Sequence, residues 1–165
     1  MKPRKERSKR MRVLHLWSWS EVARAVSYLR SVTASLREHY LEVLTAQRKL
    51  DQTAKDKAPA KRARLIETTR LTDERQRAQT KFDEALAELN RVDVFLLDPV
   101  QGLALIPFRK GDDLAWYVFD HFAPGVVGWR FHADPIEERR ELSLLPDVTE
   151  LEPGSALNVP NVPGD

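Results

Sequence analysis

Apolar residues recur every three or four positions over residues 19–52, a spacing that predicts a helix packed lengthwise against another helix. The residues on this line are Val22, Val26, Leu29, Thr33, Leu36, Tyr40, Val43, Gln47 and Leu50. Ser18 and Glu21 mark the helix start, because a Ser followed three positions later by a Glu is the pattern of a capping box. We therefore expect a helix over residues 19–52.

A second amphipathic segment follows a short connection that contains Pro59, a residue suited to the first turn of a helix. Its apolar line is regular near the end, at Ala78, Phe82, Ala85 and Leu89, but Arg75 falls on the same line further back. We expect a helix over residues 59–91. Two amphipathic helices of similar length with a short connection predict an antiparallel hairpin with a coiled-coil seam.

After residue 98 the helical period gives way to short apolar runs separated by turn residues. The expected strands are residues 103–108, 114–120 and 126–132. The middle strand is apolar on both faces, so one face can pack on the hairpin, whereas the other needs a tail or a second chain. The predicted fold class is α+β, a long antiparallel helical hairpin followed by a three-stranded antiparallel β-meander.

Charge divides the 165-residue chain into a body and two tails, although the net charge is only +2. Residues 1–12 carry a net charge of +6, and residues 143–165 carry −4 and four prolines. Residues 1–12 have too few apolar groups to pack, and residues 146–165 contain all four of these prolines, so we expect both stretches to be disordered. We expect residues 136–145 to form a short helix or an extended arm. Residues 13–142 are expected to form a single domain.

The basic residues of the first tail predict one function, because they could neutralise the phosphates of RNA or a ribosome. They are Lys2, Arg4, Lys5, Arg7, Lys9, Arg10 and Arg12. A second basic cluster, Lys61–Arg64, opens the second helix, where positive charge opposes the helix dipole. Either that helix begins later or the cluster has an anionic partner, and a solvated face is the further alternative.

Composition removes several function classes. The chain has no cysteine, which excludes disulfides, thiolate catalysis and cysteine-ligated zinc. It contains no Gly-rich phosphate loop and no nucleophile elbow, so we predict no catalytic residue and no cofactor. No apolar run reaches the roughly 18 residues of a membrane span. We expect a soluble, cytoplasmic protein without a membrane partner.

Histidines and arginines near the predicted strands are the candidates for a chemical site. His121 and His132 lie in or beside neighbouring strands, and two imidazoles with a nearby carboxylate could bind a transition metal or act as an acid–base pair. Surface histidines at strand ends are the alternative. Arg130 and Arg139 could bind an anionic ligand, because guanidinium groups match carboxylates and phosphates.

Several stretches of residues 13–142 follow a pattern shared by one bacterial family. They are Trp17–Ala25, Phe95–Leu103, Ala115–Phe119 and the segment from Trp129 through Arg139 to Leu142. On them the chain resembles the family called domain of unknown function 2203, with Asp98, Gly102 and Leu103 at recurrent positions and Arg130 where the family usually has a histidine. The resemblance implies a helical hairpin followed by a compact strand unit, and a bacterial origin. It implies no activity.

Three function classes stay open at this point. The long seam and the doubly apolar sheet favour a non-catalytic interaction or structural module, either a homodimer or a protein that binds a partner through the aromatic sheet. The basic tail favours an RNA- or ribosome-associated factor. His121 and His132 are the residues on which an enzyme or metal-binding protein would depend. We take the interaction module as the leading hypothesis.

Overall fold

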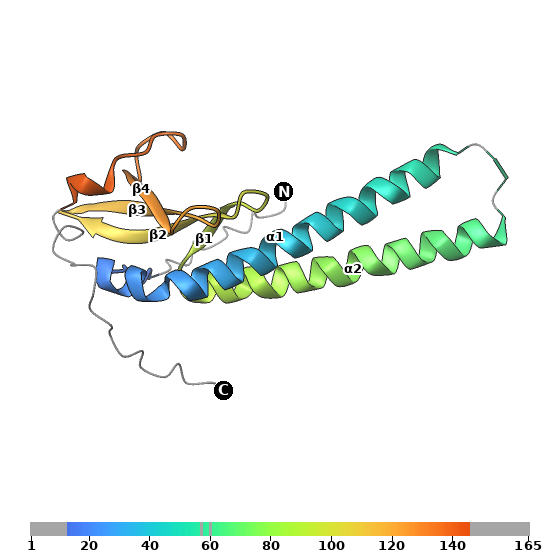
Figure 1. The fold of residues 1–165 in the computed structure, drawn as a ribbon, viewed down its shortest axis with the longest axis horizontal. Helices are drawn as coiled ribbons and strands as arrows, with labels where there is room; N and C mark the ends of the chain where they lie inside the picture. Colours follow the sequence, from blue (N-terminus) through green and yellow to red (C-terminus); the bar gives the residue numbers. More distant parts are fainter. Residues whose placement is uncertain (1–12, 57, 60, 146–165) are drawn as a thin grey trace, which may run out of the picture.

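The protein is a long helical hairpin with a small sheet at one end (Figure 1). The computed structural model describes residues 13–56, 58–59 and 61–145. Within these residues the elements are α1 (Trp19–Lys55), α2 (Arg62–Arg91), β1 (Phe95–Asp98), β2 (Leu103–Lys110), β3 (Asp113–Asp120), β4 (Val126–Phe131) and the 3-10 helix η1 (Leu142–Leu144). The predicted α+β fold is confirmed. Residues 1–12 and 146–165 of the predicted tails lie outside the described residues.

Among the described residues, four strands form one antiparallel sheet in the order β1-β2-β3-β4. The sequence predicts three of them. The additional strand is β1, which pairs Phe95 with Leu105 of β2. A run this short carries too few alternating positions to signal a strand, and only its pairing with β2 defines it.

The start of α1 has the predicted capping box. The Ser18 N–H donates to Glu21 Oε2 at 2.7 Å, and the Glu21 N–H donates to Ser18 Oγ at 3.3 Å. The bond from the Ser18 N–H holds the pKa of the Glu21 carboxyl below its usual value. At its other end α1 passes the predicted limit at residue 52 and reaches Lys55, because no glycine or proline interrupts it. α2 begins at Arg62, after the expected residue 59.

The hydrophobic core lies where the first half of α1, the end of α2 and one face of the sheet meet. Its buried residues are Val22, Leu29, Val32, Leu36, Leu89, Val94, Ala104, Ile106, Phe108, Ala115, Tyr117, Phe119, Trp129 and Leu145. The predicted alternation in the middle strand is confirmed, since Ala115, Tyr117 and Phe119 all lie in this core. Leu145 falls in the predicted C-terminal tail, so that part of the tail is folded against the core.

The segment before α1 fixes the hairpin to the sheet. Asp93, in the turn between α2 and β1, has a left-handed backbone with φ of 56°, and its carboxylate accepts the His15 N–H at 2.8 Å. Trp17 donates its indole N–H to the Val92 carbonyl at 3.0 Å and its backbone N–H to the Pro107 carbonyl at 2.8 Å. These bonds join three segments that are far apart in the sequence.

The far half of the hairpin, residues 41–78, extends away from the sheet (Figure 1), and we call it the arm. None of the core residues named above lies in it. Among its described residues the buried apolar side chains are Ala46, Leu71 and Ala78. In the described part of the chain, no helix is both long enough and apolar enough to cross a membrane.

The position of the core predicts which leucines stabilise the fold. Leu29 is fully buried in the core, whereas Leu65 in the arm is 58% exposed. We expect Leu29→Ala to lower the free energy of unfolding by about 2–5 kcal/mol, because the change leaves a cavity. The matched change Leu65→Ala should alter it by less than about 0.5 kcal/mol. Urea denaturation followed by tryptophan fluorescence measures both, and equal losses would contradict this placement of the core.

Candidate functional site

His121 lies at the junction between α1 and the turns of the sheet. Its Nδ1 is 3.1 Å from the hydroxyl of Thr33, a fully buried residue of α1. The Thr33 hydroxyl also lies 2.8 Å from the Leu29 carbonyl, so it links the backbone of α1 to the His121 ring. The His121 ring therefore connects the turn after β3 to α1 through a hydrogen bond.

Two arginines of α1 reinforce this junction. The Arg30 guanidinium donates to the Ala123 carbonyl at 3.0 Å, and Arg37 Nε donates to the Val100 carbonyl at 2.9 Å. Arg37 also lies 5.0 Å from the centre of the Phe122 ring. The polar side chains on this side of α1 thus bind backbone of the two turns, and they serve docking rather than chemistry.

His132 is at the opposite end of β3 from His121. Its backbone N–H donates to Leu114, at the start of β3, whereas His121 follows the last residue of that strand. Eight residues of strand separate the two ends by about 25 Å. The structure therefore does not bring the two imidazoles together, because antiparallel pairing places the end of β4 beside the start of β3.

The His132 ring has its own structural role. The Trp116 indole N–H donates to His132 Nδ1 at 3.1 Å, so the ring nitrogen at that position is an acceptor. Within the described residues, no group of three or more His, Asp or Glu side chains is placed to hold a metal ion.

The two arginines proposed for anion binding have different surroundings. Arg130 is only 6% exposed, and its guanidinium donates to the Asp134 carbonyl at 2.6 Å and to the Phe131 carbonyl at 3.4 Å. Arg139 is exposed beside β4. Because Arg130 is already bonded to backbone inside the fold, the structure does not present the pair as one open anion site.

Arg140, which the sequence analysis did not select, organises the corner after β4. It forms ion pairs with Asp134 at 3.2 Å and Glu138 at 3.3 Å, and its guanidinium lies over the rings of Trp129 and Phe131. The hydrogen bond from Arg140 is the main reason why the pKa of Asp134 is below its ordinary value. No sequence motif marked Arg140, since its partners meet only when it pairs with Trp129 as an isolated bridge.

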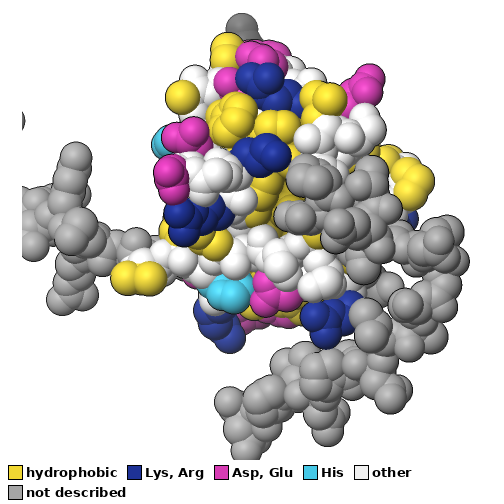
Figure 2. Space-filling model, turned by 90° about the vertical axis from the view of Figure 1, so that its left-hand side faces the viewer, with side chains coloured by type: hydrophobic (Ala, Val, Ile, Leu, Met, Phe, Trp, Pro, Cys, Tyr) yellow, Lys and Arg dark blue, Asp and Glu magenta, His cyan; other side chains and the backbone are white. Residues whose placement is uncertain are grey.

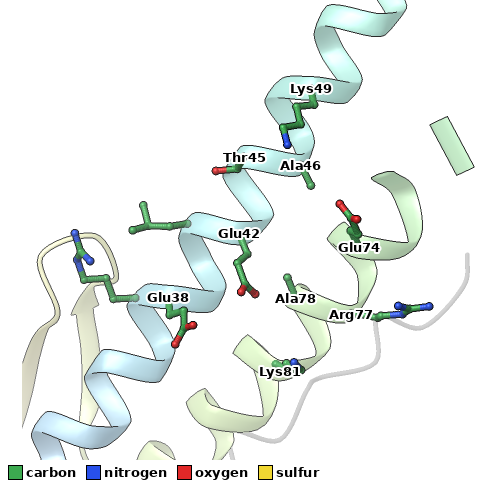
Figure 3. Close-up of a pocket in the computed structure, with 11 residues that line it drawn as sticks. Glu38, Glu42, Thr45, Ala46, Lys49, Glu74, Arg77, Ala78 and Lys81 are labelled. Carbon is green, nitrogen blue, oxygen red and sulfur yellow. The ribbon is translucent and has the colours of Figure 1, made fainter. Parts of the chain in front are cut away.

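A groove of about 570 Å³ lies between α1 and α2, where the arm meets the rest of the hairpin (Figure 3). Ala46 and Ala78 form part of its wall, and their small side chains leave the space between the helices open. The charged groups that line it are Arg37, Glu38, Glu42, Lys49, Glu74, Arg77 and Lys81. Both signs of charge alternate around it, so the groove selects no particular charged ligand.

The end of the arm is the most basic part of the described chain. Arg48, Lys49, Lys55, Lys61 and Arg62 are all exposed there. Arg64 is different, because it donates to the carbonyls of Ala58 at 2.8 Å and Asp56 at 2.7 Å and so holds the connection between the helices. The basic residues of the N-terminal tail, from Lys2 to Arg12, lie outside the described residues.

The fold and these contacts define a class of protein, a helical hairpin anchored on a small antiparallel sheet. Comparison of the chain with protein-family models, with curated proteins and with solved structures finds no match. The resemblance to domain of unknown function 2203 therefore stays a prediction. Within the described residues, His121 and His132 lie at opposite ends of β3, and Arg130 is bonded to backbone carbonyls.

Two glycines provide a test of the His121 junction. Gly102 and Gly111 have nearly the same φ, +66° and +63°, so an added methyl group strains both backbones equally. At Gly102 the new Cβ would lie 2.6 Å from His121 Cβ, whereas at Gly111 it meets nothing within 4 Å. We expect Gly102→Ala to lower the unfolding free energy by about 1–3 kcal/mol more than Gly111→Ala. Chemical denaturation of both variants measures the difference, and equal effects would contradict a tight junction.

Asp134 predicts a pH dependence of stability. Its folded pKa lies below the ordinary 3.8, so its charged form stabilises the fold above that pH, and the contribution disappears as the pH falls through the folded pKa. We expect Asp134→Asn to be less stable than wild type at pH 7, with a deficit that shrinks below about pH 4. Urea denaturation between pH 2 and pH 7 follows it. The control Asp112→Asn, at a side chain 97% exposed, should show no comparable deficit.

Proposed function

We propose that this protein is a non-catalytic interaction module in which the sheet and the adjoining helix ends form a base that holds the arm out toward a partner. The observation that carries the proposal is the arm itself, which extends beyond the sheet (Figure 1) while none of the core residues lies in it.

The energetics of the arm support this proposal. Ordering the backbone costs about 1–2 kcal/mol per residue in conformational entropy. In return, the described part of the arm buries Leu71 and two alanines, Ala46 and Ala78. Its helices also form backbone hydrogen bonds, but those would be equally available in a shorter hairpin. Core stability therefore does not account for the length of the arm, whereas a surface role does.

The polar and aromatic side chains of the base also support the proposal, because most of them are used within the fold. His121, His132 and Arg130 are each engaged in hydrogen bonds within the fold. Most aromatic side chains of the strands are also buried, whereas Phe95 and Phe131 are half-buried. The buried ones are Phe108, Trp116, Tyr117, Phe119 and Trp129. Partner binding through the aromatic sheet stays a prediction.

Removing the end of the arm tests the proposal. We would replace residues 47–76 by a short Gly-rich loop that joins Ala46 to Arg77. Because this leaves every core residue in place, we expect a folded protein with a melting temperature within about 5 °C of wild type, a shift worth about 1 kcal/mol.

Tagged full-length and shortened proteins would then be crosslinked in the cells that produce them, and the recovered proteins and nucleic acids quantified. We expect a partner that is recovered with the full-length chain and lost with the shortened one. Identical recovery would contradict the proposal. Light scattering on the purified proteins tests a second copy of the chain as the partner, because an arm-mediated dimer becomes a monomer when the arm is shortened.

A further inference from the structure

We propose that the end of the arm binds the phosphate backbone of a double-stranded nucleic acid. We call this region, residues 48–66, the tip. The inference rests on the proposed function, because it names the partner of the arm. It concerns a surface other than the N-terminal tail, which the sequence analysis selected for nucleic acid.

Charge is separated along the long axis of the molecule. The described residues of the tip include six basic and two acidic residues, a net charge of +4, and the rest of the described part of residues 13–142 carries −5. Figure 2 looks at the opposite, sheet end, where acidic and basic side chains lie interleaved. Within the described part of residues 13–142, a polyanion is attracted to the tip and repelled by the remainder, so the field of this part orients the arm with its tip toward the polyanion.

The cations of the tip are available to a ligand. Arg48, Lys55, Lys61 and Arg62 are exposed and form no ion pair within the part of the chain that the structure describes. About two turns further along α2, Arg70 behaves differently, because it is paired with both Glu67 and Glu74. Arg70 is thus neutralised by two neighbouring carboxylates, whereas these four cations of the tip have no ion-pair partner among the described residues.

The basic residues at the start of α2 do not serve the stability of that helix. α2 begins at Arg62 after its N-cap Lys61, and its first turn has no acidic residue and no side-chain cap from the N-cap residue. Positive charge at this end opposes the helix dipole and is unfavourable by about 0.3–1 kcal/mol per charge. Lys61 and Arg62 destabilise the start of α2. An anionic ligand that neutralises these two charges would explain their presence there.

The distribution of the cations favours an extended polyanion. They lie on the ends of both helices, and Arg48 and Lys55 alone are separated by about 10 Å along α1. A nucleic-acid backbone supplies phosphates over such a distance and releases counterions at each contact. An isolated surface pair with a protein carboxylate contributes only about 0–1 kcal/mol. The tip contains no aromatic residue for base stacking, which favours a duplex over a single strand.

The test compares two triple variants of the full-length chain with the same change in net charge. The tip variant is Arg48→Gln, Lys61→Gln and Arg62→Gln, and the control at the sheet end is Arg109→Gln, Lys110→Gln and Arg139→Gln. Both keep the N-terminal tail, so the contribution of the tail is common to all three proteins. The tip variant should melt no lower than wild type, because two of its changes remove charge that opposes the α2 dipole.

Binding is measured by fluorescence anisotropy with a labelled 20-base-pair DNA duplex and the equivalent RNA duplex between 50 and 300 mM salt. We expect the tip variant to bind at least about tenfold more weakly than the control at low salt. On DNA the slope of log K against log salt should fall by up to about 2.7 for the three lost contacts. The two duplexes show which nucleic acid is preferred, and preference for either supports the inference.

Three outcomes would overturn the inference. One is equal binding by the tip variant and the control; another is no binding of either duplex by wild type at 50 mM salt. The third is that wild type binds polyglutamate or phosphatidylserine vesicles, the latter through exposed Leu65 and Ile66, at least as tightly as the duplexes. The proposed function is judged separately, because a partner lost on shortening the arm but retained by the tip variant would support the interaction module and reject the nucleic acid.

Discussion

The structure depends on the packing of the first half of α1. This half of the helix contacts α2 on one side and the sheet on the other. Leu29 and Leu36 are fully buried at this double interface. The polar groups on the same stretch are satisfied as well, since Thr33 meets His121 and both Arg30 and Arg37 bind turn carbonyls. A helix that is held on two sides over half its length provides a rigid base from which the other half can project.

This constraint accounts for the unequal distribution of chemistry over the molecule. In the base, histidine and arginine side chains are used to close turns and corners, because buried polar groups must find partners. In the arm, two exposed helices need few buried residues, and the surface is free to carry charge. The groove between Ala46 and Ala78 has the same cause. Small residues on the seam leave a space between the helices that no large side chain fills.

The seam illustrates how a local irregularity can be resolved by a distant residue. Gln47 and Arg75 interrupt the apolar lines of the two helices when each is read alone. In the folded hairpin the Arg75 guanidinium donates to the Gln47 side-chain oxygen, so the two polar residues satisfy each other across the interface. The candidate histidines show the converse. The sequence places His121 and His132 in or beside neighbouring strands, but in the folded protein the length of β3 separates them.

Features that depend on nearby residues can be predicted from the amino-acid sequence. Ser18 and Glu21 define a helix start through bonds across one turn, and Ala115 to Phe119 alternate because neighbouring strand residues point to opposite faces. Features that depend on the pairing of distant residues become visible only in the folded protein. Strand β1 exists because Phe95 meets Leu105, Arg140 acts because Trp129 and Asp134 surround it, and the ends of two helices bring their cations together at one tip. Local periodicity does not encode such distances, because they are set by how the elements pack.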